Sequence, residues 1–214
     1  MVSRMSLSLQ NKRKQRIVFL DRDGVINRDS PDYIKSWREF EFLPRSLSAL
    51  RLLNENLFQV IIVTNQSAVG RKMISLRDLN HIHSKMKTAI KAGGGLIQDI
   101  FFCPHLPQDR CACRKPKPGM LFSAQQKYRI NLTAAYMVGD RAKDVECAKK
   151  AGCGYALLVQ TANDEAEGTL ALKKIVPDFV AEDLFAAAEW IIAHRLRAEN
   201  DLNAMNPMKG VSEI

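Results

Sequence analysis

Short apolar runs recur along the chain and alternate with longer amphipathic segments. The runs are rich in β-branched and aromatic residues, which is typical of strands buried on both faces of a parallel sheet. They occupy residues 16–20, 58–63, 100–103, 135–138 and 155–159. Five buried strands are therefore expected, and the segments between them are expected to be mostly helical.

Apolar residues in the intervening segments recur at the three- and four-residue spacing that predicts amphipathic helices. The first such helix is expected to open at Pro44, a residue favoured in the first turn, and to carry an apolar face of Leu47, Leu50, Leu53 and Leu57. A second helix is expected to begin at the capping-box variant at 75–78, to carry an apolar face that starts at Leu76, and to end at the glycines at 93–95. Three further helices are expected over residues 119–129, 142–151 and 184–192.

Alternation of strands and helices predicts βαβ units joined by right-handed crossovers. We therefore expect an α/β fold with a Rossmann-like, doubly wound parallel sheet. Residues 16–197 are expected to form a single domain, with a flexible N-terminus at 1–15 and a flexible tail at 198–214. Active sites in such sheets lie at the carboxyl ends of the strands.

The 214-residue chain contains 32 basic and 23 acidic residues, and its net charge of +9 favours anionic partners. Nucleic acid and small phosphorylated substrates both fit this charge, as does a plain solvated surface. No run of 18 apolar residues occurs, and the N-terminus lacks the apolar core of a secretory signal. Five cysteines, three of them clustered, argue against a disulfide framework and favour a reducing compartment such as the cytoplasm.

Acidic and hydroxyl side chains follow three of the predicted strands. Asp21 and Asp23 follow the first strand, Thr64 follows the second, and Asp140 with Asp144 follows the fourth. Parallel strands end at one edge of a sheet, so these groups can converge on one pocket, where the carboxylates repel one another. A divalent cation relieves that repulsion, and an all-oxygen ligand set suits Mg²⁺.

These residue types match the needs of phosphoryl transfer. Asp21 can attack as a nucleophile and form an aspartyl-phosphate, and Asp23 can protonate the leaving alkoxide and then deprotonate water. Thr64 can hydrogen-bond the transferring oxygens, and Lys115 can neutralise charge on them. Taken singly, the Asp-x-Asp pair also fits a turn, and the Gly-Asp-x-x-x-Asp motif also fits a helix cap. Their order on alternating strands favours catalysis.

In this order, the four motifs resemble the signature motifs of the haloacid dehalogenase superfamily of phosphatases. The resemblance covers about residues 16–154 and leaves no segment long enough for a large cap domain, so a capless member is expected. It implies that Asp21, the backbone carbonyl of Asp23 and Asp140 bind the catalytic Mg²⁺. Asp144 is a further candidate, as a ligand or as a partner of the ligands.

A second candidate metal site lies in the loop at residues 103–113. Cys103, His105, Cys111 and Cys113 supply three thiolates and one imidazole, a common structural zinc set. The pairs are spaced more tightly than the usual Cys-x-x-Cys, so unrelated free cysteines are the alternative. A structural Zn²⁺ here would brace the segment that carries the predicted catalytic lysine.

The segments DRDGVIN, TNQSAVGR, CPHLPQDRCACRKPKPGM and MVGDR together resemble the heptose bisphosphate phosphatase and histidinol phosphatase branch of the superfamily. The short zinc loop is similar to that of histidinol phosphatases, whereas the flap INRDSPDYIKSW and the run KPKPGM resemble the heptose enzymes. The resemblance implies substrate contacts from the flap, the end of the second strand and two arginines, namely Asp29, Tyr33, Asn65, Gln66, Ser67, Arg114 and Arg141.

The resemblance further implies removal of the 7-phosphate of D-glycero-D-manno-heptose 1,7-bisphosphate, for nucleotide-activated heptose and lipopolysaccharide core, by a cytoplasmic monomer. Hydrolysis of histidinol phosphate is the alternative within the same chemistry. A nucleic-acid 3′-phosphatase fits the charge, but the sequence shows no aromatic stacking platform or long basic stripe. A non-catalytic, zinc-stabilised nucleic-acid-binding module would explain the cysteines but not the acids at three strand ends. Neither nucleic acid nor a membrane is therefore expected as a partner.

Overall fold

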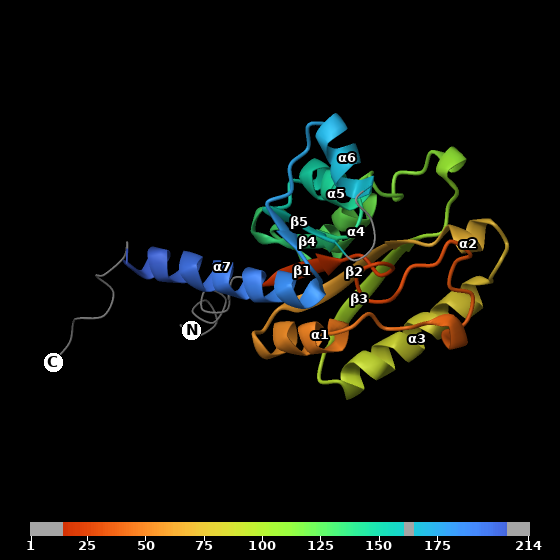
Figure 1. The fold of residues 1–214 in the computed structure, drawn as a ribbon, viewed down its shortest axis with the longest axis horizontal. Helices are drawn as coiled ribbons and strands as arrows, with labels where there is room; N and C mark the ends of the chain where they lie inside the picture. The colour runs from red at the N-terminus through yellow and green to blue at the C-terminus, as the bar shows by residue number, and fades with distance from the viewer. Residues whose placement is uncertain (1–14, 161–164, 205–214) are drawn as a thin grey trace, which may run out of the picture.

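The computed structural model describes residues 15–160 and 165–204, and the strands in these ranges form one six-stranded sheet (Figure 1). Every neighbouring pair is parallel, and the spatial order is β3-β2-β1-β4-β5-β6. The strands are β1 Ile17–Leu20, β2 Gln59–Asn65, β3 Ile97–Cys103, β4 Tyr136–Gly139, β5 Tyr155–Val159 and β6 Phe179–Ala181. The expected doubly wound parallel sheet is confirmed.

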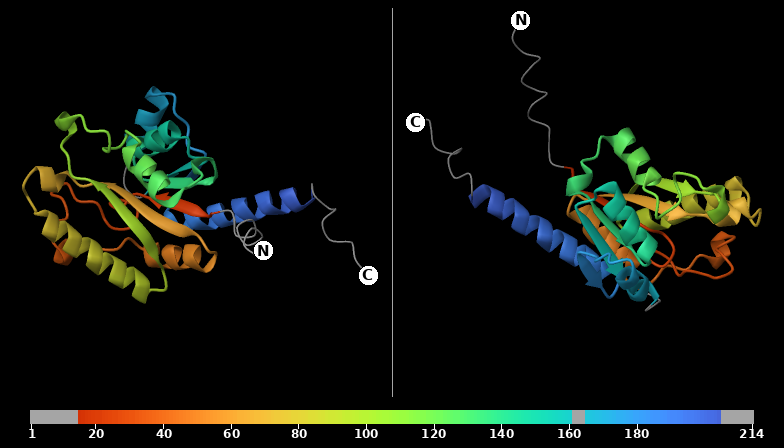
Figure 2. Two further views of the ribbon diagram at one scale, coloured as in Figure 1. Left: turned by 180° about the vertical axis from the view of Figure 1, so that it is seen from behind. Right: turned by 90° about the horizontal axis from the view of Figure 1, so that it is seen from above.

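Helices cover both faces of the sheet, as Figures 1 and 2 show. One layer contains α1 Ser46–Glu55, α3 Leu76–Ala92 and α7 Leu184–Ala204, and the other contains α4 Gly119–Tyr128, α5 Ala142–Ala151 and α6 Glu165–Leu172. Successive residues of β1 point to opposite layers, so Val18 and Leu20 join one apolar core while Ile17 and Phe19 join the other. This two-sided burial explains why the strands are continuous apolar runs.

The order of the strands reverses at β1, and this switch point determines where an active site can lie. It builds β2 and β3 on one side of β1 and then returns to place β4 on the other side. The connections that leave the carboxyl ends of β1 and β4 therefore diverge and leave a crevice between them. The backbone N–H of Asp21 donates to the carbonyl of Val138 at 3.0 Å, which joins the two strands at this crevice.

The short elements of the fold lie mostly in the connections. They are α2 Ser67–Gly70 and the 3₁₀ turns η1 Trp37–Glu39, η2 Pro107–Asp109 and η3 Leu132–Ala134. Within the described ranges, all strands belong to the one sheet and the connections add only these short pieces, as expected of a capless member. None of the helices in these ranges has the length and apolar character needed to cross a bilayer.

Two details of the first predicted helix are wrong. Pro44 lies before the helix, because α1 begins at Ser46 and Arg45 takes a left-handed conformation as its N-cap. Leu57 lies beyond the end of α1, has a φ of +63° and is 67% exposed. The chain turns at Leu57, and the next residue, Phe58, is buried in the core. One detail of the second predicted helix is also wrong: Leu76 is 51% exposed, and the buried apolar residues of α3 begin at Leu79.

The elements β6, α2 and α6 were not expected, and the last helix is longer than expected. Residues 198–204, predicted as part of a flexible tail, continue α7 to Ala204. Glu199 explains this continuation, because it accepts from Arg195 one turn earlier at 2.8 Å and from Arg16 at the start of the sheet at 2.9 Å. The flexible ends predicted at 1–14 and 205–214 lie outside the described residues.

The capping box of α3 supports a stability prediction. The N–H of Asp78 donates to the hydroxyl of Ser75 at 3.2 Å, and the N–H of Ser75 donates to the carboxylate of Asp78 at 2.9 Å. Ser75→Ala should lower the free energy of unfolding by about 1 kcal/mol, measured by urea denaturation. The control is Ser84→Ala in the exposed middle of the same helix, which should cause no loss. Equal losses in the two variants would contradict a capping role.

Candidate active site

Three buried carboxylates meet at the crevice between β1 and β4. Asp21 follows β1, Asp140 follows β4, and Asp144 lies one turn into α5. Each has a carboxylate oxygen within 4.8 Å of the other two, and the residues are 4%, 6% and 0% exposed. The sequence therefore predicted correctly that these acids converge.

One buried cation lies among these acids. The ammonium of Lys115 is 2.8 Å from Asp21 Oδ2 and 2.7 Å from Asp144 Oδ1, and it also donates to the carbonyl of Val63 at 2.8 Å. Burial opposes charging of Lys115, but the carboxylates of Asp144 and Asp21 raise its pKa above the ordinary value. Lys115 therefore remains charged next to the predicted nucleophile.

The buried lysine does not balance three carboxylates, even though the half-exposed Arg141 lies 3.6 Å from Asp140 Oδ2. Burial, together with Asp21 and Asp144, raises the pKa of Asp140 to about 8. Burial also raises the pKa of Asp21, with Asp144 adding to the effect and Lys115 opposing it. Among the described residues, Asp140 Oδ1 is buried without a hydrogen-bond partner. An unpaired oxygen within an acidic, all-oxygen cluster fits a hard divalent cation such as Mg²⁺.

Gly24 makes this close packing of acids possible. Its φ is +79°, a conformation that residues with a Cβ rarely adopt, and a Cβ there would lie 2.1 Å from Asp140 Oδ2. The glycine thus lets the loop after β1 turn directly beneath the carboxylate of Asp140. The Gly in the Asp-x-Asp-Gly motif is therefore a steric requirement of the acidic cluster.

The carboxylate of Asp23 has different surroundings from the other acids. Its Oδ1 accepts from Nε and Nη2 of Arg22, at 3.1 and 2.8 Å, and from Asn27 at 2.9 Å. Its Oδ2 accepts from Gln66 at 2.7 Å. Burial alone would raise the pKa of Asp23, but Arg22 and these hydrogen bonds outweigh burial and hold the pKa below its ordinary value. No role was predicted from the sequence for Arg22 or Asn27, although both lie in the DRDGVIN segment.

Residues at the end of β2 contact Asp23 and Lys115, two of the residues predicted to be catalytic. Gln66 donates to the hydroxyl of Thr64 at 2.9 Å as well as to Asp23. The amide of Asn65 donates to the carbonyl of Lys115 at 3.2 Å and accepts from its N–H at 3.0 Å. Asn65, predicted to contact substrate, therefore has its amide engaged in holding the backbone of Lys115.

A cavity of about 260 Å³ opens beside the acids. Its lining includes every residue that the sequence predicted for substrate contact, together with part of the catalytic set, namely Asp21, Asp23, Asp29, Tyr33, Thr64, Asn65, Gln66, Ser67, Arg114 and Arg141. A larger cavity of about 730 Å³ lies near Arg16 and Phe58, at the amino ends of the strands. Active sites of doubly wound sheets lie at the carboxyl ends, so the smaller cavity is the candidate.

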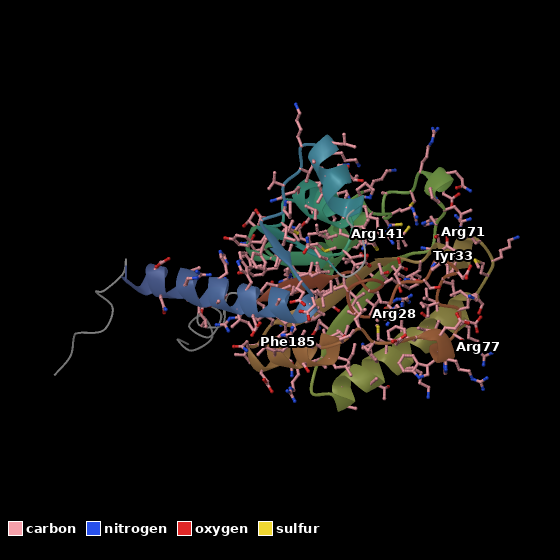
Figure 3. The ribbon with its side chains drawn as sticks, viewed as in Figure 1. Arg28, Tyr33, Arg71, Arg77, Arg141 and Phe185 are labelled. Atoms are coloured by element: carbon pink, nitrogen blue, oxygen red, sulfur yellow. The ribbon has the colours of Figure 1, made fainter. Side chains whose placement is uncertain are left out.

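The rim of this cavity is basic. Arg141 on the β4 side forms an ion pair with Asp29 of the flap at 2.8 Å. Figure 3 shows Arg71 beside Tyr33, whose ring lies 5.7 Å from the guanidinium carbon. Arg114 donates to the carbonyl of His105 at 3.2 Å, so it also holds the cysteine loop.

The four predicted zinc ligands form one cluster. The thiol sulfur of Cys111 is 3.6 Å from that of Cys103 and 3.5 Å from that of Cys113. His105 Nδ1 lies 3.5 Å from the sulfur of Cys103 and 3.3 Å from that of Cys113. Tetrahedral zinc with Zn–S bonds of about 2.3 Å places its ligand atoms about 3.6–3.8 Å apart, so this cluster can hold zinc.

Comparison with known proteins places the chain and its fold among phosphatases. A family model described as HAD-hydrolase-like matches residues 112–187. The D-glycero-beta-D-manno-heptose-1,7-bisphosphate 7-phosphatase of Bordetella bronchiseptica is 42% identical over 83% of this chain and 98% of its own length. The enzyme of the same name from Pseudomonas aeruginosa is 37% identical over 82% of this chain and 97% of its own length.

Solved structures of phosphatases also resemble this chain. The crystal structure of D,D-heptose 1,7-bisphosphate phosphatase from B. bronchiseptica, complexed with magnesium and phosphate, matches with a TM-score of 0.78 and 40% identity. The match covers 84% of this chain and 99% of that one. The D,D-heptose 1,7-bisphosphate phosphatase of Burkholderia thailandensis matches with a TM-score of 0.63 and 32% identity, over 84% and 99% of the two chains.

The cysteine cluster yields a prediction about metal content. Purified protein should contain about one tightly bound Zn²⁺ per chain, measured by elemental analysis. Cys111→Ser should lose the zinc, lower the melting temperature and reduce turnover, because the loop leads directly into Arg114 and Lys115. Cys153→Ala, a buried cysteine outside the cluster, serves as the control and should keep the zinc. A zinc-free preparation with full activity and unchanged melting would contradict the structural role.

Proposed function

Because this chain belongs to the haloacid dehalogenase superfamily of phosphatases, we propose that it removes the 7-phosphate of D-glycero-D-manno-heptose 1,7-bisphosphate through a phosphorylated Asp21. The observation that carries the proposal is the buried pair of Asp21 and Lys115, 2.8 Å apart at the edge of a basic cavity. Relatives of 42% and 37% identity, which carry this activity in their names, support the substrate. They favour heptose bisphosphate over histidinol phosphate, and the β anomer over the α anomer.

In the first step, a carboxylate oxygen of Asp21 attacks the phosphorus in line with the bond to the sugar. The new bond joins phosphorus to Asp21, and the bond to the sugar oxygen breaks. Asp23 gives its proton to the leaving alkoxide. Because Oδ1 of Asp23 already accepts three N–H groups, Oδ2 is the oxygen that carries this proton.

In the second step, water attacks the phosphorus and the bond to Asp21 breaks. Asp23, now ionised, takes the proton of the water, so its protonation state is restored and inorganic phosphate leaves. The low pKa of Asp23 favours the ionised form that this step needs and opposes the protonated form that the first step needs. Lys115 and the hydroxyl of Thr64 contact the transferring oxygens in both steps and stabilise the charge that develops on them.

Asp21, Asp140 and the backbone carbonyl of Asp23 are the residues that would hold the Mg²⁺. When bound, Mg²⁺ supplies positive charge that neutralises the acids and the phosphoryl oxygens. The raised pKa of Asp140 and its unpaired Oδ1 support this assignment, because both reflect negative charge that the described side chains leave unbalanced. Asp144, fully buried against Lys115, is better placed to hold the lysine than to contact the metal.

The non-reacting phosphate of a bisphosphate requires positive charge at the far end of the substrate. Arg114 and Arg141 line the cavity beyond Lys115 and supply planar guanidinium groups that bind phosphate oxygens in pairs. Binding energy gained at that remote phosphate can hold the reacting phosphate in line with Asp21. Arg141 would exchange its ion pair with Asp29 for the phosphate.

We also propose that the enzyme acts as a cytoplasmic monomer that does not bind nucleic acid. The small phosphorylated sugar handled by the relatives supports an intracellular biosynthetic role, and the clustered thiols support a reducing compartment. The product would enter the synthesis of nucleotide-activated heptose for lipopolysaccharide core or another surface glycan.

The covalent mechanism predicts different effects for the two aspartates. Asp21→Asn keeps the shape but removes the nucleophile, so turnover should fall to background while the melting temperature remains near that of the wild type. Asp23→Asn should still transfer phosphoryl from an aryl phosphate but should hydrolyse the intermediate slowly, so a burst should appear in rapid-quench kinetics. Chelation of Mg²⁺ should stop both reactions. Retention of a tenth of wild-type turnover by Asp21→Asn would exclude this mechanism.

The basic rim predicts a preference for bisphosphates. The wild type should show kcat/KM about ten- to a hundred-fold higher for heptose 1,7-bisphosphate than for heptose 7-phosphate or histidinol phosphate, the range expected for charge-assisted hydrogen bonds. Arg114→Ala should abolish most of this preference and affect an aryl phosphate far less. Arg110→Ala, an exposed arginine of the same loop outside the cavity, is the control. A wild type that favours histidinol phosphate would overturn the substrate and leave only the phosphatase chemistry.

A further inference from the structure

A buried chain of contacts connects α3 to the predicted acid–base residue. His83 of α3 is 6% exposed, and its Nε2 lies 3.3 Å from Nη1 of Arg22, whose side chain is 1% exposed. The other two donor nitrogens of the same guanidinium, Nε and Nη2, bind Oδ1 of Asp23. One arginine therefore joins a helix residue to a carboxylate at the edge of the cavity.

The state of His83 fits an acceptor. Burial and the neighbouring Arg22 cation lower the pKa of His83 to about 3, so the ring is neutral at physiological pH. A neutral imidazole has one nitrogen that accepts a hydrogen bond, and Nε2 is the nitrogen that faces the guanidinium. Such an acceptor matters because a buried N–H without a hydrogen-bond partner destabilises the arrangement that buries it.

The orientation of the ring is determined by the core. His83 is flanked on α3 by Ile82 and Met86, which are 1% and 0% exposed. Its ring packs edge-on against Phe102 of β3, with centroids 5.8 Å apart and an interplanar angle of 63°. Rotation of His83 away from Arg22 would therefore require repacking of the helix against the sheet.

Arg22 and Asp23 meet only because the chain turns sharply after β1. Neighbouring side chains point apart in a strand, but the carbonyl of Arg22 accepts from the N–H groups of Ile26 and Asn27, at 2.8 and 3.2 Å, and so closes a tight turn. With Oδ1 held by Arg22 and Asn27, the rotamer of Asp23 is fixed. Its Oδ2, which contacts Gln66, is the oxygen left for proton transfer.

We propose that His83 is a positioning residue for the reaction: acting through Arg22, it holds the carboxylate of Asp23 in the orientation that proton transfer requires. The inference rests on the proposed function, since it gives Asp23 the acid–base role. It adds a residue of α3 that lies outside the cavity lining and cannot touch the substrate.

The test uses the dependence of rate on the leaving group. An alkyl phosphate needs the acid in the first step, whereas p-nitrophenyl phosphate has a good leaving group and does not. His83→Ala should therefore lower kcat/KM for heptose 1,7-bisphosphate about tenfold and change kcat/KM for p-nitrophenyl phosphate less than about twofold. For the aryl substrate, kcat and KM should fall together, because the later attack of water on the intermediate also uses Asp23.

Three variants separate positioning from a general loss of structure. His83→Gln supplies an acceptor oxygen near the place of Nε2 and should restore most of the alkyl activity. His83→Leu fills the space without an acceptor and should reproduce the loss, which keeps the test decisive if His83→Ala does not fold. His81→Ala, on the exposed side of the same helix, should behave as the wild type.

Two outcomes would overturn the proposal: equal losses of kcat/KM for the alkyl and aryl substrates, or a His83→Gln variant no better than His83→Leu. Both can be measured with any alkyl phosphate that the wild type accepts. A wild type that hydrolyses other alkyl phosphates but not heptose 1,7-bisphosphate would instead refute the proposed substrate, so the two failures remain distinct.

Discussion

Repulsion among three buried carboxylates is the constraint on which the rest of the structure depends. Burial of an ionised acid is costly unless a partner offsets it, and here one buried lysine pairs with two of three clustered acids. The fold brings them together because the carboxyl ends of β1 and β4 are adjacent at the switch point of the sheet. The negative charge that remains is what makes the site suitable for a divalent cation and a phosphoryl group.

The supporting structure is arranged to deliver Lys115 to that cluster. Asn65 holds the lysine backbone from β2, the carbonyl of Val63 accepts from its ammonium, and Asp144 pairs with it from α5. The preceding loop is gathered by the cysteine and histidine cluster. A structural metal in that loop would therefore affect catalysis through the position of Lys115.

Two carboxylates separated by a single residue have been given opposite environments. Burial, with Asp144 adding to it, raises the pKa of Asp21, whereas Arg22 and the N–H donors around Asp23 outweigh burial and lower the pKa of Asp23. This division matches a nucleophile and an acid–base pair that act in sequence on one phosphoryl group. The difference lies in the partners: Asp21 faces Lys115, whereas Asp23 accepts from Arg22, Asn27 and Gln66.

The sequence by itself determined the features that depend on local order. Strand and helix periodicity predicted the doubly wound sheet, and the positions of Asp21, Thr64 and Asp140 after their strands predicted the acidic site, because parallel strands end at a common edge. The spacing of the cysteines and His105 likewise predicted a cluster that the structure contains. Even so, local patterns misplaced Leu57, because a left-handed turn that ends a helix leaves the apolar spacing unchanged.

Only the tertiary structure decided which other side chains contact the site residues that the sequence predicted. His83 and Arg22 are 61 residues apart, and Asp29 and Arg141 are 112 apart, so no spacing in the sequence relates them. A lone histidine on a helix has the same sequence pattern whether it faces solvent, as His81 does, or a buried guanidinium. The difference lies in which face of α3 packs on the sheet and which loop lies beneath it. Those contacts are set by the packing of the whole domain, because hydrogen bonds and ion pairs depend on distance in space and not on separation along the chain.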